Sequence, residues 1–418
     1  MDQHEKALLH SVENATTEVN TLRSQLERAE KRLEYAQSEL ALIRAIKTTN
    51  VETMDRGTKR KFDEKQHKDL ISLMCKNAYP YPVNFQKSYY ISSQHDKKLR
   101  SLALCPVNDK LFATSAMDGI VNLWEVISWG EEVNLNSSTN CLTPEQCRWP
   151  EDIAWHPDGD RIFSVYNANS LDSQISIMYL SRVGEDPEEM NDINFLEHKP
   201  HTKGIINNIS FMPWENTCFV TGGSDHVVIL WSENGEDDWR PKTLHKNLHA
   251  AMVMGVSGMQ QKQIVLSVGK DKRIVGYDVC AEREDFTHII DSRCLSVIPN
   301  PCDYNLFMVQ AGASEKQLRL FDIRTKQKEL HTFGWTQAIT LEARTNLINQ
   351  AWSPNGMYIT SGSSYEMIHI FDIRCNGQNP SQSLQAHQKG ISKVSWLQSL
   401  PLLISMSSDN NIGLHKLV

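Results

Sequence analysis

The chain has 418 residues, of which 40% are hydrophobic and 22% charged, a composition that allows a folded protein with a large core. Its net charge of −8 argues against binding dominated by nucleic-acid phosphates, which requires a basic surface. The nine scattered cysteines form no C-x-x-C pair, so we expect neither a zinc site nor a disulfide framework. No apolar run resembles a signal peptide or a membrane span, which predicts a protein of the nucleus or cytoplasm.

Residues 1–47 are predicted to form a coiled-coil helix. From residue 8 to residue 43, apolar side chains recur at alternating intervals of four and three without glycine or proline, which is the heptad pattern. The open alternatives are an amphipathic helix lying on the rest of the protein and a helix that pairs with another protein. The predicted seam contains Val12, Val19, Leu22, Leu26, Leu33 and Leu40.

Residues 48–82 are predicted to form a polar linker. A charged run from Lys59 to Lys68 indicates a solvated, partly helical segment, which Pro80 and Pro82 would end. The basic triplet that starts at Lys59 is either a nuclear import signal or part of this solvated surface.

Seven units along residues 95–415 share one pattern, in which a turn residue precedes by six positions a bulky residue that closes a short apolar strand. Successive units lie 44 to 55 residues apart, a period typical of β-propellers. The seven pairs are Asp118/Trp124, Ser173/Tyr179, Asp225/Trp231, Asp271/Tyr277, Glu315/Phe321, Tyr365/Phe371 and Asp409/His415.

Four of these units also carry a histidine and a serine or threonine at matching positions. In this they resemble the WD-repeat family, over about 335 residues, in which a His, a Ser/Thr, an Asp and a Trp form a hydrogen-bonded tetrad within each blade. The resemblance implies an all-β, seven-bladed propeller, with Tyr277 and His415 in the Trp place of two blades. The implied tetrad residues are His95, Thr114, Asp118, Trp124, His201, Thr221, Asp225, Trp231, His249, Ser267, Asp271, His387, Ser405 and Asp409.

The remaining three units depart from this pattern. The second and sixth have no matching histidine, and the fifth has only His288 as a candidate, with Glu315 in the Asp place. The His/Ser/Asp sets also look like catalytic triads, but their recurrence in successive blades favours a structural role. The sequence contains no phosphate-binding glycine loop, H-E-x-x-H or G-x-S-x-G motif, so we expect no enzyme, cofactor or metal.

The seventh unit ends at Val418, after its third strand. We expect residues 83–93 to supply the missing outer strand, which would join the two ends of a propeller that spans residues 83–418 and cover a sheet edge.

Charged loops follow the third strands of the first five units. Acidic loops beside a basic one could attract a basic tail, or could only keep the surface soluble. The acidic residues are Glu131, Glu132, Glu185, Asp186, Glu188, Glu189, Asp192, Glu233, Glu236, Asp237, Asp238, Glu282, Glu284 and Asp285. The basic residues of the fifth loop are Arg324, Lys326 and Lys328.

The tetrapeptide F-D-I-R occurs twice, as Phe321-Asp322-Ile323-Arg324 and as Phe371-Asp372-Ile373-Arg374. Both copies resemble the W-D-x-R boxes through which WD-repeat substrate receptors dock onto the propeller adaptor of cullin–RING ubiquitin ligases, with Phe replacing Trp. Each arginine could bind a partner, pair with the aspartate two positions before it, or contact the next blade.

The sequence therefore predicts a non-enzymatic scaffold that binds protein partners through a propeller and pairs through a coiled coil. A ligase substrate receptor is the first alternative, with Arg324 and Arg374 as docking residues. A G-protein β-like subunit is the second, although the 35-residue linker and the acidic loops fit it poorly.

Overall fold

The computed structural model describes Val19 and residues 74–76, 79–127, 130–143, 146–168, 172–180, 193–235, 238–325, 329–336 and 350–417. The chain divides into two units, Met1–Glu64 and Lys65–Val418. In the first unit only Val19 is described, as a helical residue. The predicted coiled coil and the charged run from Lys59 to Lys68 otherwise lie outside the described residues.

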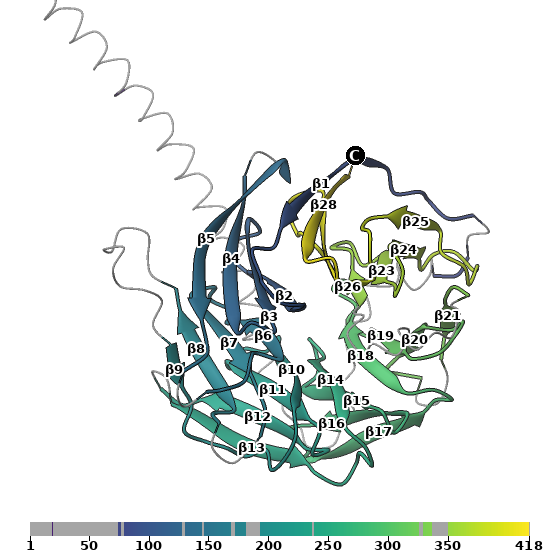
Figure 1. Cartoon of the computed structure of the whole chain (residues 1–418). Helices are drawn as coiled ribbons and strands as arrows, with labels where there is room; N and C mark the ends of the chain where they lie inside the picture. Colours follow the sequence, from purple (N-terminus) through teal and green to yellow (C-terminus); the bar gives the residue numbers. More distant parts are fainter. Residues whose placement is uncertain are drawn as a thin grey trace, which may run out of the picture. The chain divides into compact units, whose positions relative to one another are not determined.

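Within the residues that the structure describes, the second unit forms seven antiparallel sheets of four strands, arranged in a ring (Figure 1). The predicted seven-bladed propeller is confirmed. Blade 1 comprises β2 (Leu99–Leu104), β3 (Leu111–Ala116), β4 (Ile120–Ile127) and β5 (Glu132–Asn140). Blade 2 comprises β6 (Asp152–Trp155), β7 (Arg161–Val165), β8 (Ile175–Tyr179) and β9 (Ile193–Phe195). Blade 3 comprises β10 (Ile206–Phe211), β11 (Cys218–Gly223), β12 (Val228–Glu233) and β13 (Trp239–His245).

The next three blades follow in chain order. Blade 4 comprises β14 (Val253–Gly258), β15 (Ile264–Gly269), β16 (Arg273–Asp278) and β17 (Arg283–Ile289). Blade 5 comprises β18 (Cys294–Pro299), β19 (Leu306–Ala311), β20 (Leu318–Asp322) and β21 (His331–Phe333). Blade 6 comprises β22 (Gln350–Trp352), β23 (Tyr358–Gly362), β24 (Met367–Asp372) and β25 (Gln382–Gln385).

Blade 7 is built from both ends of this unit. Its first three strands are β26 (Ile391–Trp396), β27 (Leu402–Ser407) and β28 (Asn411–Leu417), and its outer strand is β1 (Phe85–Ser92). β1 runs antiparallel to β28 and places Tyr89 opposite Leu414. It lies within residues 83–93, where we expected the closing strand, and it covers the edge that β28 would otherwise expose.

The apolar core lies between neighbouring blades. One cluster joins Phe112 and Trp124 of blade 1 to Ile404 and Leu414 of blade 7, and similar clusters fill the other interfaces. The second strands β11, β15, β19 and β27 are buried along their whole length. This burial on both faces explains their near-continuous apolar sequences.

A series of hydrogen bonds between polar groups links five blades. It runs along the first strand of each blade, which lies nearest the centre of the ring (Figure 1). Ser101 donates a hydrogen bond to Asp152 Oδ1 over 2.6 Å, and Asn208 Nδ2 donates to Asp152 Oδ2 over 2.7 Å. Lys393 Nζ donates to Ser101 Oγ over 3.0 Å, and the Val256 N–H donates to Asn208 Oδ1 over 2.8 Å. Blades 7, 1, 2, 3 and 4 are therefore joined by buried and partly buried hydrogen bonds as well as by apolar packing.

Tyr179 ends β8, as the sequence predicted, but it lies on the opposite face of the sheet from the bulky residues that close the third strands of the other blades. Met178 pairs with Ile162, as Trp124 pairs with Phe112 in blade 1, and Met178 packs at the interface with blade 1. Tyr179 packs instead in the cluster shared with blade 3. The six-residue spacing from the turn does not determine which face the side chain occupies, because a shift of one residue along a strand moves it to the opposite face.

Candidate partner-binding sites on the propeller

The structure brings together the complete tetrads of blades 1 and 3. In blade 3, His201 Nδ1 lies 3.0 Å from Asp225 Oδ1, and His201 Nε2 lies 2.9 Å from Thr221 Oγ1. The Trp231 indole N–H donates to the same Thr221 oxygen over 3.1 Å. Blade 1 repeats this geometry with His95, Thr114, Asp118 and Trp124, at distances of 3.0, 3.1 and 2.9 Å.

Blade 7 completes its tetrad with a different residue. His387 Nδ1 lies 3.3 Å from Asp409 Oδ2, and His387 Nε2 lies 2.7 Å from Ser405 Oγ. His415 Nε2 lies 2.8 Å from Ser405 Oγ, in the place of an indole N–H, and His415 Nδ1 lies 2.9 Å from Ser88 Oγ of β1. The relay of blade 7 therefore extends to the strand that closes the ring.

Blade 4 keeps three tetrad members and replaces the fourth. His249 Nδ1 lies 3.2 Å from Asp271 Oδ1, and His249 Nε2 lies 2.9 Å from Ser267 Oγ. Tyr277 occupies the Trp place, but the second partner of Ser267 is His245 Nε2, at 3.3 Å. Burial, with a smaller effect of His249, lowers the pKa of His245 to about 3, so this imidazole is neutral at physiological pH.

The tetrads are buried braces. In blade 3 the side chains of His201 and Asp225 are each 1% exposed, which leaves no room for a substrate beside them. Burial alone would raise the pKa of Asp225, but the hydrogen bond and charge of His201, together with two backbone N–H groups, lower it. The carboxylate thus stays ionised and anchors the relay.

The predicted exceptions in blades 5 and 6 use other contacts. His288 lies inside β17 of blade 4 and stacks on Phe321, with ring centroids 5.6 Å apart, so it is not the missing tetrad histidine of blade 5. In blade 6, Thr360 Oγ1 accepts a hydrogen bond from the indole of Trp396, which belongs to blade 7.

The two F-D-I-R boxes have the same internal geometry. Phe321 and Phe371 are buried, and each arginine forms a forked pair with its own aspartate. Arg324 Nη2 lies 2.6 Å from Asp322 Oδ2, and Arg374 Nη2 lies 2.9 Å from Asp372 Oδ2. Pairing with the aspartate two positions before was one of the open alternatives for these arginines. The side chain of Arg324 is 40% exposed and that of Arg374 only 14%.

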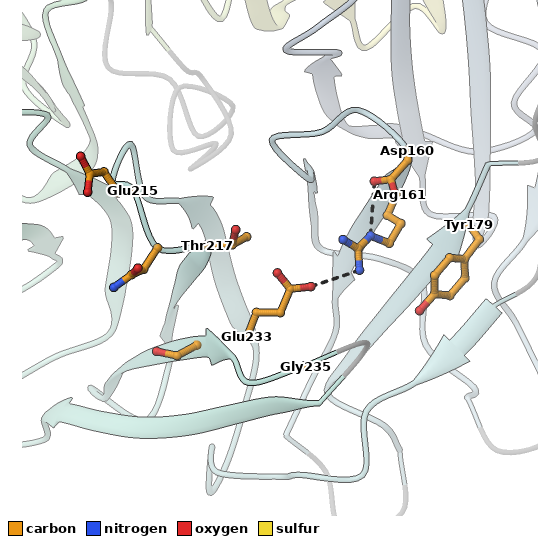
Figure 2. A pocket seen from close by; sticks show the side chains of 9 residues that line it. Asp160, Arg161, Tyr179, Glu215, Thr217, Glu233 and Gly235 are labelled. Carbon is orange, nitrogen blue, oxygen red and sulfur yellow. Dashed lines mark hydrogen bonds and ion pairs between the residues drawn. The ribbon is translucent and has the colours of Figure 1, made fainter. Parts of the chain in front are cut away.

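An open pocket of about 890 Å³ lies between blades 2 and 3 (Figure 2). It forms where the start of β7, the end of β8, the turn between β10 and β11, and the end of β12 meet. Asp160, Arg161, Tyr179, Glu215 and Glu233 contribute the larger polar side chains. Three carboxylates therefore line the pocket with a single guanidinium.

The arginine in this pocket is held by its neighbours. Arg161 Nη1 lies 3.4 Å from Glu233 Oε1, and Arg161 Nε lies 3.3 Å from Asp160 Oδ1 (Figure 2). Beneath it, Arg161 Nη2 lies 3.1 Å from Nε2 of the buried His156. Burial, followed by the charge of Arg161, lowers the pKa of His156, which keeps this imidazole neutral at physiological pH.

Comparison with known proteins agrees with this geometry. Residues 86–125 and 194–232 match the family described as WD domain, G-beta repeat. The first match includes the tetrad of blade 1, and the second includes that of blade 3. The chain is a seven-bladed propeller of the WD-repeat type.

Three relatives of this WD-repeat propeller differ in the share of their own length that the match covers. Protein tipD of Dictyostelium discoideum is 22% identical over 82% of the chain, and the match covers 53% of tipD, about half its length. A ribosome biogenesis protein WDR12 homolog of Nematostella vectensis is 23% identical over 77% of the chain and 76% of its own length. Protein transport protein sec31 of Aspergillus fumigatus is 22% identical over 58% of the chain, but only 18% of sec31 is covered.

The structure describes only some of the predicted charged loop residues of this WD-repeat propeller. Several of the described loop carboxylates have cationic neighbours. Lys416 Nζ lies 3.4 Å from Glu131 Oε1, and Arg240 Nε lies 3.0 Å from Asp238 Oδ1. The following predicted loop residues lie outside the described residues: Glu185, Asp186, Glu188, Glu189, Asp192, Glu236, Asp237, Lys326 and Lys328.

Among the described residues, no group of three or more His, Cys, Asp or Glu side chains is placed to hold a metal ion. Within the same ranges, no helix is long and apolar enough to cross a membrane. The sequence reasoning missed the polar chain through Asp152 and the pocket at Arg161. Both depend on neighbouring blades, and residues 51 to 72 positions apart carry no mutual signal in one sequence.

Proposed function

We propose that this WD-repeat propeller is a non-enzymatic scaffold that binds a basic segment of a partner protein in the pocket between blades 2 and 3. Propellers of this type are generally protein-interaction scaffolds, and the open acidic pocket is the observation that supports this particular site. The burial of the His/Ser/Asp sets supports a role without catalysis.

The charge arrangement favours a lysine or arginine side chain as the occupant. Asp160 and Glu233 hold Arg161 in place, and the carboxylates that line the pocket outnumber its guanidinium. The chain as a whole carries a net charge of −8, which would attract a basic segment before contact and make association faster at low salt.

Neutralising the pocket tests this proposal. The double variant Asp160→Asn/Glu215→Gln removes two negative charges and leaves the Arg161–Glu233 pair in place. Affinity purification with quantitative mass spectrometry should show at least one partner with a basic segment whose recovery falls about tenfold. The control Glu132→Gln/Glu284→Gln removes two exposed carboxylates elsewhere on the ring. Equal recovery from both double variants would refute the site.

We further propose that residues 1–47 pair as a coiled coil with a second copy or with another helix. Regular heptads support this, and Leu26→Asp would bury an unpaired charge at a central seam position. Light scattering should then show an oligomer becoming a monomer. An unchanged mass would contradict pairing through this seam.

We also propose that the protein lies in the nucleus or cytoplasm.

A cullin–RING substrate receptor is the second candidate, supported by the shared geometry of the two F-D-I-R boxes. Replacing Arg324 and Arg374 by Lys keeps a positive charge beside each buried aspartate but removes the planar guanidinium, so it should abolish co-purification of the adaptor with little change in melting temperature. A large fall in melting temperature would show that both arginines are structural. A G-protein β-like role would require a stable complex with a co-expressed γ-like helix.

The relatives bear names from protein transport and from ribosome biogenesis. These roles differ from each other, so we carry over to this chain only the interaction scaffold.

A further inference from the structure

The chain lays one of its own segments across the F-D-I-R box of blade 6. This segment, the blade-6 strap, comprises residues 74–76 and 79–83. Met74 packs on the apolar cluster between blades 5 and 6, and the Cys75 N–H donates to the Ile373 carbonyl over 3.1 Å. Val83 packs on the cluster between blades 6 and 7. The strap therefore crosses blade 6 from one interface to the next, although the sequence had predicted a solvated linker up to residue 82.

Tyr81 makes the central contacts of the strap. Its N–H donates to Asp372 Oδ2 over 3.1 Å, and its carbonyl accepts from the Tyr358 hydroxyl over 3.3 Å. Its ring lies against the Arg374 guanidinium, 4.5 Å from the ring centroid. The box therefore recognises an aromatic residue through its ring, its N–H and its carbonyl together.

The prolines make the strap well suited to this surface. Pro80 and Pro82 carry no N–H and favour an extended backbone, also at the residue before each proline. The remaining N–H groups of Tyr81 and Val83 meet the two acceptors that blade 6 offers, Asp372 Oδ2 and Gln382 Oε1. An extended segment with alternating prolines thus presents its donors on one side, at little loss of conformational entropy.

The strap is a surface contact that another segment could replace. Tyr79 is 85% exposed and Tyr81 is 55% exposed. The hydrogen bond from the Tyr358 hydroxyl to the Tyr81 carbonyl is also exposed, and exposed hydrogen bonds are typical of regions that open locally while the rest of a protein stays folded.

Arg374 itself does not depend on the strap for its position. Its forked pair with Asp372 and a hydrogen bond of 2.8 Å to the Tyr358 hydroxyl hold the guanidinium from within blade 6. The recognition surface would therefore remain after the strap leaves.

We propose that the F-D-I-R box of blade 6 is a binding site for extended aromatic–proline segments, which the strap fills in cis and which a Tyr-Pro segment of a partner protein fills by displacing it. This site is separate from the pocket between blades 2 and 3. The box of blade 5 differs, because Leu306 pairs with Asp322 where Tyr358 pairs with Asp372. It therefore lacks the hydroxyl that binds the Tyr81 carbonyl.

A labelled synthetic peptide with the sequence of residues 77–84 tests the site on the full chain by fluorescence anisotropy. Tyr81→Ala weakens the strap, so the peptide should bind this variant at least tenfold more tightly than the wild type. Adding Arg374→Ala should abolish binding, whereas adding Arg324→Ala in the other box should leave it unchanged. Binding that is equal in all variants, or that is lost equally with either arginine, would overturn the proposal.

A second measurement uses the wild-type protein, so its result does not depend on whether a variant folds. Cys75 belongs to the strap, and both its N–H and its thiol contact the Ile373 carbonyl, so displacement of the strap should expose the thiol. Excess peptide should speed alkylation of Cys75 by iodoacetamide several-fold, as followed by mass spectrometry. Cys294, which is fully buried in the core, reports unfolding and should stay unmodified. An unchanged rate at Cys75 with saturating peptide would also reject the proposal.

Discussion

Blades 3 and 7 each complete a four-stranded sheet and a buried hydrogen-bond relay, but they use different strands and residues to do so. Blade 3 takes its four strands from one continuous stretch, and its relay ends on Trp231, a donor with no further bond to give. Blade 7 borrows β1 from the other end of the propeller, and its relay ends on His415, whose second nitrogen contacts Ser88 of that strand.

The direction of the hydrogen bonds explains why histidine suits the last position of blade 7. Because Asp409 accepts from His387 Nδ1–H, His387 Nε2 must accept from the Ser405 hydroxyl. Ser405 Oγ then accepts from His415 Nε2–H, as Thr221 Oγ1 accepts from the indole in blade 3. His415 Nδ1 is left as an acceptor for the Ser88 hydroxyl. His415 therefore donates a hydrogen bond to Ser405, as an indole would, and also accepts one from the closing strand.

Removing β1 should have the largest effect and should separate the two blades most sharply. Deletion of residues 83–93 leaves blade 7 with three strands and exposes the edge of β28, so we expect the whole ring to lose cooperative folding. Calorimetry and size-exclusion chromatography would measure this. A soluble product that melts as cooperatively as the intact protein would contradict the role of β1 as the closing strand.

Breaking the relay of blade 3 should have the next largest effect. Thr221→Val keeps the shape of the side chain but leaves the Trp231 N–H and His201 Nε2 buried without a partner, at a cost of about 2–4 kcal/mol. Denaturant unfolding of the purified variant would measure the loss. Ser405→Ala is the matched change in blade 7, and a similar loss there would show that the two relays are energetically equivalent. A loss below about 0.5 kcal/mol in blade 3 would argue against a bracing role.

Acid should act through His415 of blade 7 and through His245, which ends β13 of blade 3 and contacts Ser267 of blade 4. Burial, followed by the charge of His387, lowers the pKa of His415 to about 3, and burial lowers that of His245 to about 3 as well. Both imidazoles are neutral in the folded protein and take up a proton on unfolding below about pH 6.5. The free energy of unfolding should therefore fall as the pH decreases from 6.5 toward 3, by about 2 kcal/mol per histidine at pH 5.

His415→Gln removes one of these titrating groups while retaining a donor and an acceptor. Denaturant unfolding at pH 7 and pH 5 should show a smaller loss of stability for this variant than for the wild type. An identical loss would indicate that His415 is not the acid-sensitive group.

The smallest expected effect concerns the link between the relay and β1. Ser88→Ala removes the hydroxyl that donates to His415 Nδ1 and should cost about 1 kcal/mol. Ser210→Ala in blade 3, whose hydroxyl donates to a neighbouring carbonyl over 3.4 Å, is a matched control with a smaller expected loss. Equal losses from both variants would show that the link contributes nothing beyond an ordinary partly buried hydroxyl.

The repeated pattern allowed the number of blades, the tetrads of blades 1, 3, 4 and 7 and the place of the closing strand to be predicted. Each of these depends on spacing within one unit or on an incomplete last unit, and such spacing is visible in a linear sequence. Tyr179 closes β8 as predicted, but in blade 2 Met178 takes the buried place, which the spacing alone did not show.

The chain by itself determined which residues form strands, since local apolar runs and turn residues specify them without reference to distant positions. Only the tertiary structure decided what meets across the blades: Asp152 between Ser101 and Asn208, Glu233 against Arg161, and Tyr81 on Arg374. These pairs lie 51, 56, 72 and 293 residues apart, so their contact depends on how whole sheets stack and on the path of the chain over the surface. Hydrogen bonds and charges of this kind are set by three-dimensional distance, which a one-dimensional pattern does not contain.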